Sequence, residues 1–499
     1  MDLRLHPGNL LHFIVAFLVL ILAGCAMVGP DYVPPQTRVS GTWHSSLRGG
    51  LTAENGEPAG MARWWTALND PGLSGLVERA VAGNLDLKQA RARIREARAR
   101  QGVAVAGLFP TVDASASAAW SRNSKDTGYD QTSSLYRAGF DASWELDVFG
   151  GIRRSVQAAG ADLQASEEDL RDTLVSLLAE VAVNYIELRT FQARLAVAES
   201  NLEAQSETHR LVTWRYEAGL SDALATQEAR YNLENTRSQI PPLRTGQEEA
   251  LNRIAVLLGE QPGNVHKELE KISPIPTTPL KVAIGIPAEA LRRRPDVRKA
   301  ERELAAQTAR IGAAKADLYP RFTLSGSIGL EALSVNRLFS LSNRTRSGTP
   351  LVTWPVFDGG AIRQNIEIQT ALQEQALIQY ENKVLTALEE VENAVVAYAE
   401  EQQRSLALRE ASLAAEQAVE LAGNKYQAGL ANFISVLDAQ RSLLSFQDQL
   451  AQSNGAITSN LVRLYKALGG GWESIAPEGK GRQVLSGEMA GEKEFLEIK

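Results

Sequence analysis

The chain has 499 residues, and its 52 basic and 59 acidic side chains give a formal net charge of −7. This small, dispersed acidic excess argues against a nucleic-acid partner, which would need a basic surface. A single cysteine excludes an intrachain disulfide, so the fold must be stabilised by packing.

A short apolar stretch lies just before the only cysteine. Residues 13–21 are all apolar but too few to span a bilayer, and Leu22-Ala23-Gly24-Cys25 follows them. Small residues before a cysteine are typical of a cleaved secretory signal. We therefore predict a lipoprotein signal peptide over 1–24 and a lipid on Cys25, where each buried methylene contributes about 0.8 kcal/mol of anchoring. An ordinary signal with a chance cysteine is the alternative.

The rest of the chain contains an internal repeat with an offset of 210 residues. Its clearest sign is Tyr216-Glu217-Ala218-Gly219-Leu220, which recurs as Tyr426-Gln427-Ala428-Gly429-Leu430. Motifs around Pro110, Trp144 and Gly259 recur in the same order at the same spacing. The sequence thus predicts the following segments: repeat 1 over 84–272, a proline-rich linker over 273–293, repeat 2 over 294–470 and a polar C-terminal tail over 471–499.

Each repeat is expected to contain a helix, two strands and a long helical hairpin. A proline-free helix over about 151–216 would be roughly 100 Å long at 1.5 Å per residue. It carries a stripe with alternating steps of four and three, as in a coiled coil. The members of this stripe are Leu170, Leu174, Leu177, Val181, Asn184, Leu188, Phe191, Leu195, Ala198 and Leu202. An ordinary bundle is the alternative, but it would not need a helix of this length.

Four segments alternate between apolar and polar residues, as strands with one apolar face do. These segments are 111–121, 135–147, 321–331 and 349–357. The pattern is typical of strands in a transmembrane barrel, although a half-buried sheet in a soluble protein is the alternative. Because single-chain barrels begin at about eight strands, four strands would have to be shared between subunits. Two chains would supply eight strands and three would supply twelve.

Several motifs together resemble the TolC-like outer membrane factor family, in the NodT-type lipoprotein branch that serves resistance–nodulation–division (RND) efflux systems. The motifs are Gly29-Pro30-Asp31-Tyr32, Asp70-Pro71-Gly72-Leu73, Arg293-Arg294-Pro295-Asp296-Val297 and Leu464-Tyr465-Lys466-Ala467-Leu468-Gly469. The resemblance covers nearly all of the chain after Cys25.

This resemblance implies a mainly α fold with a membrane β-barrel. Three chains would each contribute four strands to one 12-stranded barrel, and their coiled-coil helices would form an α-barrel across the periplasm. The segment 25–83 would supply the anchor and an equatorial region. The homotrimer would lie in outer membrane lipid and passively conduct substrates that an inner-membrane RND pump expels through a periplasmic adaptor (membrane fusion) protein.

The resemblance also implies roles for the two recurring turns and for the helix after the second one. The turns would be periplasmic tips that contact the adaptor through Tyr216, Gly219, Leu220, Tyr426, Gly429 and Leu430. Ile434 and Asp438 match the family's periplasmic aperture, where three copies of Asp438 would form a carboxylate ring. Plain helical turns and a solvated helix carboxylate are the alternatives.

No catalytic or metal-binding motif is evident. The histidines after Cys25, namely His44, His209 and His266, are far apart in sequence, and a lipidated cysteine offers no thiol. We therefore expect no enzyme and no cofactor other than the acyl and diacylglycerol lipid on Cys25. An exit duct for type I protein secretion and a non-channel structural lipoprotein are the alternative functions.

Overall fold

The computed structural model describes residues 27–36, 39–54, 58–122, 124, 126 and 132–474. Cys25, the predicted signal peptide and most of the predicted tail lie outside the described residues. The chain divides into two compact units that each combine segments of both repeats. The first unit comprises Met1–Thr37, Arg91–Glu168 and Arg298–Lys383, and the second comprises Arg38–Ala90, Asp169–Val297 and Val384–Lys499.

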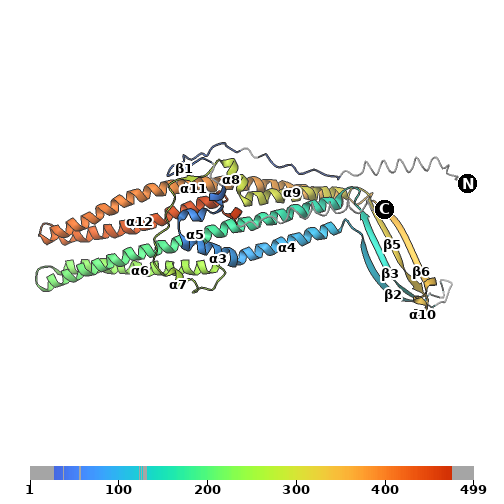
Figure 1. Cartoon of the computed structure of the whole chain (residues 1–499), viewed down its shortest axis with the longest axis horizontal. Coiled ribbons are helices and arrows are strands. Elements are labelled where there is room, and N and C mark those ends of the chain that lie inside the picture. Colours follow the sequence, from blue (N-terminus) through green and yellow to red (C-terminus); the bar gives the residue numbers. More distant parts are fainter. Residues whose placement is uncertain are drawn as a thin grey trace, which may run out of the picture. The chain divides into compact units, whose positions relative to one another are not determined.

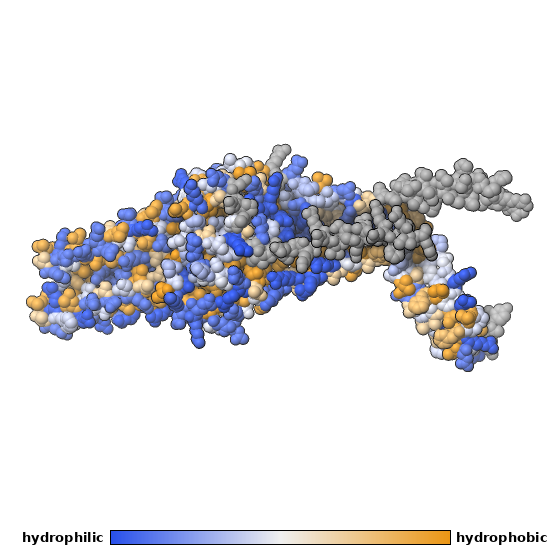
Figure 2. Space-filling view, viewed as in Figure 1, coloured by the Kyte–Doolittle hydropathy of each residue, from blue (hydrophilic) through white to orange (hydrophobic). Residues whose placement is uncertain are grey.

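A four-stranded antiparallel sheet belongs to the first unit (Figure 1). Its strands, in spatial order, are β2 (Thr111–Arg122), β3 (Thr132–Leu146), β5 (Arg321–Ala332) and β6 (Arg344–Thr353). Even-numbered residues lie opposite even-numbered residues throughout, as Trp144 lies opposite Leu324. The predicted alternation therefore gathers apolar side chains on one face. That face is open in a single chain, where Phe140 is 57% and Ile328 66% exposed. Figure 2 shows hydrophobic residues at the surface of the sheet.

The opposite face of the sheet carries polar side chains that pair across strands. Arg137 and Glu331 form a salt bridge of 2.8 Å, and the Ser115 hydroxyl donates to Asp141 at 2.7 Å. The charged side chains in the even register, Arg344 and Arg346, lie in the first half of β6, where the Arg344 Nε donates to the carbonyl of Leu341 at 2.9 Å. Burial of a charged side chain without such a partner is costly. The sheet thus requires an apolar environment on one side and water on the other.

The fourth strand begins and ends earlier than the sequence predicted. It covers Arg344–Thr353, whereas the alternation pointed to 349–357. Pro355 has no backbone N–H and cannot continue the ladder, while Pro350 is tolerated because β6 is an edge strand. Arg344 and Arg346 occupy even positions, where the alternation requires apolar residues, so the first half of the strand could not be recognised from the sequence.

Equivalent tryptophans join strand to helix in both repeats. Trp144 Nε1 donates to the carbonyl of Leu108 at 3.0 Å, and Trp354 Nε1 donates to that of Leu318 at 3.0 Å. These carbonyls follow two equivalent helices, α4 (Leu85–Ala106) and α9 (Pro295–Ala316). The repeated tryptophans therefore fix the connection between helix and strand in each copy.

The long helices are α5 (Gly151–Glu217) and α11 (Ala361–Gln427), each of 67 residues. Each is followed by a tight turn and a helix of 35 residues, α6 (Ala223–Leu257) or α12 (Phe433–Ala467). The predicted stripe on α5 is confirmed, since Leu174, Leu177, Val181, Leu188 and Ala198 are buried. None of its ten members is exposed. Among the residues described, no helix has the length and hydropathy needed to cross a membrane.

Short elements complete the chain around the core of the second unit. There, Trp64 is fully buried and stacks on Tyr465 with ring centroids 5.4 Å apart, and burial raises the pKa of Tyr465 to about 12. The segment predicted as a linker contains a strand and a helix. The short elements are β1 (Leu51–Thr52), which pairs in parallel with β4 (Val282–Ala283), α2 (Pro58–Ala62), α3 (Pro71–Gly83), α7 (His266–Leu269), α8 (Pro287–Arg293) and α10 (Val335–Leu338), with single 3-10 turns at Trp64–Leu68, Leu341–Asn343 and Trp472–Ser474.

A polar layer interrupts the apolar packing of the long hairpins in the second unit. Gln205 of α5 and Asn232 and Thr236 of α6 are at most 2% exposed. The side-chain amide of Gln205, Nδ2 of Asn232 and the hydroxyl of Thr236 have no hydrogen-bond partner. A buried polar group without a partner costs about 1–3 kcal/mol. This layer, which we call the polar layer, therefore weakens the packing at this level.

Replacing Asn232 with leucine should stabilise the protein, because the buried amide would no longer lack a partner. We expect a gain of about 1–2 kcal/mol in the free energy of unfolding, measured as a higher Tm in detergent. Asn235→Leu is the matched control, since Asn235 is exposed on the same helix and its loss should leave the Tm unchanged. A lower Tm for Asn232→Leu would contradict this interpretation.

Candidate functional site

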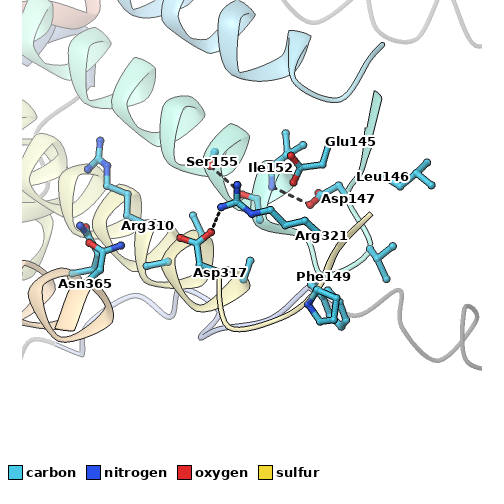
Figure 3. Close-up of a pocket in the computed structure, with 17 residues that line it drawn as sticks. Glu145, Leu146, Asp147, Phe149, Ile152, Ser155, Arg310, Asp317, Arg321 and Asn365 are labelled. Atoms are coloured by element: carbon cyan, nitrogen blue, oxygen red, sulfur yellow. Dashed lines mark hydrogen bonds and ion pairs between the residues drawn. The ribbon is translucent and has the colours of Figure 1, made fainter. Parts of the chain in front are cut away.

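A polar cavity of about 490 Å³ lies where the strands of the first unit meet its helices (Figure 3). Asp147, just after β3, accepts hydrogen bonds from the backbone N–H groups of Ile152 at 3.0 Å and Arg153 at 2.9 Å, which caps the first turn of α5. Asp317 and Arg321 point toward each other and form an ion pair. These charged groups are occupied with one another or with the backbone, so the cavity is a structural junction.

The His, Cys, Asp and Glu side chains of the described residues form no cluster of three or more suited to a metal ion. His266 Nε2 lies 2.9 Å from a carboxylate oxygen of Glu248, and the backbone N–H of His44 donates to Glu392 at 2.7 Å. These two histidines therefore take part in separate local contacts.

The two recurring turns adopt the same hydrogen-bonded geometry. Gly219 has φ +74° and Gly429 φ +73°, the left-handed conformation in which glycine commonly ends a helix. The N–H of Leu220 donates to the carbonyl of Arg215 at 2.7 Å, and that of Leu430 to Lys425 at 2.8 Å. This is the Schellman pattern, which satisfies carbonyls that the helix end leaves unpaired.

Polar caps begin the helices that follow the turns. Asp222 accepts a hydrogen bond from the N–H of Ala225 at 2.8 Å, and Asn432 accepts one from Ser435 at 3.2 Å. Both turns are therefore well defined at either end, while Leu220 and Leu430 between them are exposed. A defined backbone with exposed apolar side chains is suited to contact with another protein.

An apolar cluster holds the two hairpins together behind the turns. It comprises Val212, Ala225, Ala229, Phe433, Val436 and Leu437, and we call it the tip cluster. Tyr426 packs against it with its ring 5.3 Å from that of Phe433, and the Arg215 guanidinium lies 5.0 Å from the Tyr426 ring centroid. Of the predicted tip residues, Tyr426 is thus partly buried and Tyr216 is exposed.

The predicted aperture residues both lie exposed on the first turns of α12. Ile434 is 43% exposed, and Asp438 lies one turn further along the same face. An oxygen of Asp438 is 3.2 Å from Nη2 of Arg441, which also donates to the Tyr231 hydroxyl at 3.0 Å. Arg441 of α12 thus contacts both the Asp438 carboxylate and the Tyr231 hydroxyl of α6.

Asp438 was predicted from the sequence as an aperture residue, whereas Arg441 and Tyr231 were not. These two residues are equivalent positions of the two repeats, because their numbers differ by the repeat offset of 210. Their side chains differ in type, so matching of identical motifs passed over them. The pair shows that equivalent helices α6 and α12 face each other at this level.

Comparison with known proteins agrees with the repeat and the fold. The sequence pattern of the family described as "Outer membrane efflux protein" matches residues 76–260 and 286–470, and both ends of the second match lie 210 residues after those of the first. Nodulation protein T of Rhizobium leguminosarum bv. trifolii is 34% identical over 93% of this chain and 98% of its own length. The cation efflux system protein CusC of Escherichia coli O6:H1 is 31% identical over 94% of this chain and all of its own length.

Solved structures show the same architecture. The outer-membrane channel OprN superimposes with a TM-score of 0.84 and 37% identity, covering 89% of this chain and 99% of that one. The open state of the MtrE outer membrane channel of Neisseria gonorrhoeae gives a TM-score of 0.77 and 27% identity, with 90% and 99% covered. The prediction of a mainly helical fold built from two repeats is thus confirmed, and the described part of the chain contains one four-stranded sheet formed by both repeats.

Gly429→Ala should destabilise the second turn, because a side chain is strained at φ +73° even though open space surrounds the site. The expected local cost is about 1 kcal/mol. Faster hydrogen exchange of the Leu430 amide would report it. Gly423→Ala is the control, since Gly423 has ordinary helical φ on α11 and open space around it, so this change should not speed exchange. Equal exchange rates in both variants would refute the assignment of strain.

Proposed function

The chain belongs to the outer membrane efflux protein family, and we propose that it is the outer membrane exit channel of a tripartite efflux system. In this role it passively conducts substrates that an inner-membrane RND pump expels through a periplasmic adaptor. The family consists of channels, so neither a catalytic residue nor a cofactor is required. The observation that carries the proposal is one amphipathic sheet joined to two 67-residue helices in the same chain.

The edges of the sheet require a partner if its apolar face contacts lipid. In lipid, every backbone N–H and C=O must be hydrogen-bonded within the protein. Within the sheet, β2 and β6 each have one strand neighbour, so each has one unpaired side. All residues of both strands are exposed in the single chain. The sheet is therefore incomplete without further copies.

The internal repeat indicates how the edges meet. Strand β2 is the equivalent of β5, since both ends differ by 210, and β6 is the equivalent of β3. The pairing of β3 with β5 inside the chain should thus recur between β6 and β2 of the next subunit. Arg137 pairs with Glu331 and Asp141 with Ser327. Shifted by the offset, these pairs predict Ser347 opposite Ser121 of the next subunit, and Leu351 opposite its Ser117.

The helices support the same interface. Inside the chain, α9 contacts both long helices: Arg298 forms a 2.6 Å ion pair with Glu168 of α5, and Gln307 donates to Gln369 of α11 at 2.8 Å. Its equivalent α4 has only Leu87 and Ala90 buried. On α11, the equivalent of Glu168 is Ile378, which is exposed. The open faces of α4 and α11 therefore correspond to the two sides of a contact already made within the chain.

A homotrimer follows from this arrangement and from the family resemblance. Three copies would close a ring of twelve strands, within the range of closed antiparallel sheets in outer membranes. The apolar face would then contact lipid, and the polar face with Arg137 and Glu331 would line a water-filled path. We assign Cys25 as the lipidated residue, carrying diacylglycerol and an acyl chain that add a second attachment to the membrane.

The ends of the hairpins carry the remaining roles. We assign the turns Tyr216–Leu220 and Tyr426–Leu430 as the tips that contact the adaptor, which the exposed Leu220 and Leu430 support. Ile434 and Asp438 would line the periplasmic aperture of the trimer. The exposure of both side chains supports this role, and the Asp438 carboxylate lies 3.2 Å from Nη2 of Arg441. A ring of three such carboxylates favours cations.

Cysteine pairs test the predicted subunit contact directly. The double variants Ser347→Cys/Ser121→Cys and Leu351→Cys/Ser117→Cys should form disulfides between neighbouring subunits and give trimer-sized bands on non-reducing gels. Cys25 does not interfere once its sulfur carries lipid.

The matched controls recombine the same four positions. Ser347→Cys/Ser117→Cys and Leu351→Cys/Ser121→Cys are each displaced by four residues from the predicted register, which is roughly 13 Å along a strand. They should remain monomeric on the gel. Cross-linking only in these recombined variants would reject the register, and no cross-linking in any variant would reject the interface.

Asp438→Ala should raise the single-channel conductance of the purified trimer in planar bilayers several-fold, because it removes the carboxylate ring and the ion pair with Arg441. Glu234→Ala is the control: Glu234 is an exposed carboxylate of α6 that pairs with Arg237. A conducting protein that Asp438→Ala leaves unchanged would remove Asp438 from the aperture. A protein silent in all forms would count against the channel itself.

A further inference from the structure

Arg154 is a buried arginine that the proposed channel does not use. It lies in the first turn of α5 and is 3% exposed. Its Nε donates to the carbonyl of Val28 at 3.0 Å and its Nη2 to that of Gly29 at 3.2 Å, while Nη2 also lies 2.9 Å from Asp31. Apart from a 3.0 Å bond to Gln157 on its own helix, these contacts join it to the N-terminal segment.

The same segment makes three further contacts in the first unit. We call residues 27–36 the N-terminal strap. The N–H of Val28 donates to the carbonyl of Phe149 at 3.1 Å, close after the end of β3. Gly29, at φ +92°, lies so close to α9 that an added Cβ would be 2.4 Å from Cα of Gly312. The Tyr32 hydroxyl donates to Glu301 at 3.1 Å.

An aromatic contact completes the attachment to α9. The guanidinium of Arg302 lies 5.6 Å from the Tyr32 ring centroid. Burial and the neighbouring Glu301 raise the pKa of Tyr32, so its hydroxyl remains a neutral donor. Three of the four residues in the motif Gly29-Pro30-Asp31-Tyr32 thus make identified contacts. Gly29 lies close to α9, Asp31 forms an ion pair and Tyr32 donates a hydrogen bond.

We infer that Arg154 is a positioning residue that holds the N-terminal strap on α5 and α9 and so determines where the N-terminus meets the end of the sheet. A buried guanidinium needs several acceptors, and the strap supplies two carbonyls and a carboxylate within 3.2 Å of its nitrogens. Arg154 and the strap therefore depend on each other.

This inference bears on the lipid and in that respect rests on the proposed function. Cys25 precedes Val28 by three residues, which span at most about 10–11 Å. With Val28 bound to Phe149, the lipid on Cys25 can enter the membrane only near the end of β3. Without the Arg154 contacts, the anchor would be attached through a longer unrestrained segment and its place of entry would no longer be defined.

Hydrogen–deuterium exchange of the full-length lipidated trimer in detergent tests the role of Arg154. In Arg154→Gln we expect residues 27–36 to lose protection, including the Val28 amide, while peptides of the sheet and the long hairpins keep theirs. Arg154→Lys should give intermediate protection, because an ammonium group cannot contact two carbonyls and a carboxylate in one plane. Arg310→Gln is the control: it removes an ion pair between α9 and Asp162 of α5 without contact to the strap.

A second variant keeps the test decisive if Arg154→Gln does not fold. Gly29→Ala leaves Arg154 in place but forces the strap away from Gly312, so it should cause the same local loss of protection. Full protection of residues 27–36 in both variants would overturn the inference. Intact mass measured on the same samples reports the lipid separately: a protected strap on a protein without lipid would reject the anchor at Cys25 and leave the role of Arg154 intact.

Discussion

Strands β2 and β6 each present one row of unpaired backbone N–H and C=O groups, and this requirement for partners underlies most of the molecule. Water can satisfy such groups on a soluble protein, but lipid cannot. The apolar face of the sheet favours lipid, since side chains such as Phe140 and Ile328 are exposed there among the described residues of a single chain. The unpaired edges and the exposed apolar face of the sheet thus both require further copies of the chain.

The internal duplication means that one type of contact can pair all edges of the sheet. One contact joins the second strand and long helix of the first repeat to the first strand and helix of the second repeat, and it is made once inside the chain by β3 with β5 and by α5 with α9. Its equivalents on β6, β2, α11 and α4 remain open. A ring can therefore be built from a single type of interface that is used both within and between chains. The geometry of the contact within the chain predicts the geometry of the contact between subunits.

Much of this was predictable from sequence because the signals are periodic. The stripe on α5 and the alternation in β2, β3 and β5 arise from environments that are uniform along an element. Strand β6 was misplaced because Arg344 and Arg346 occupy its apolar register. The contacts of Arg154 with Val28 and Gly29 join residues over 120 positions apart, and no local pattern encodes such a pairing. Aligning the repeats position by position would show that Tyr231 and Arg441 are equivalent, but their contact is visible only in the structure.

The polar layer around Gln205, Asn232 and Thr236 has a consequence for how such proteins diversify. Beyond it, the tip cluster has its own apolar core, formed by residues such as Val212 and Phe433 from both hairpins. A second cluster around Ala198 and Ile240 packs independently on the other side. Because the two clusters are separate, a substitution in the tip cluster changes the packing of that cluster without removing an apolar contact of the other one. The ends of the hairpins can thus vary in sequence as one unit during evolution.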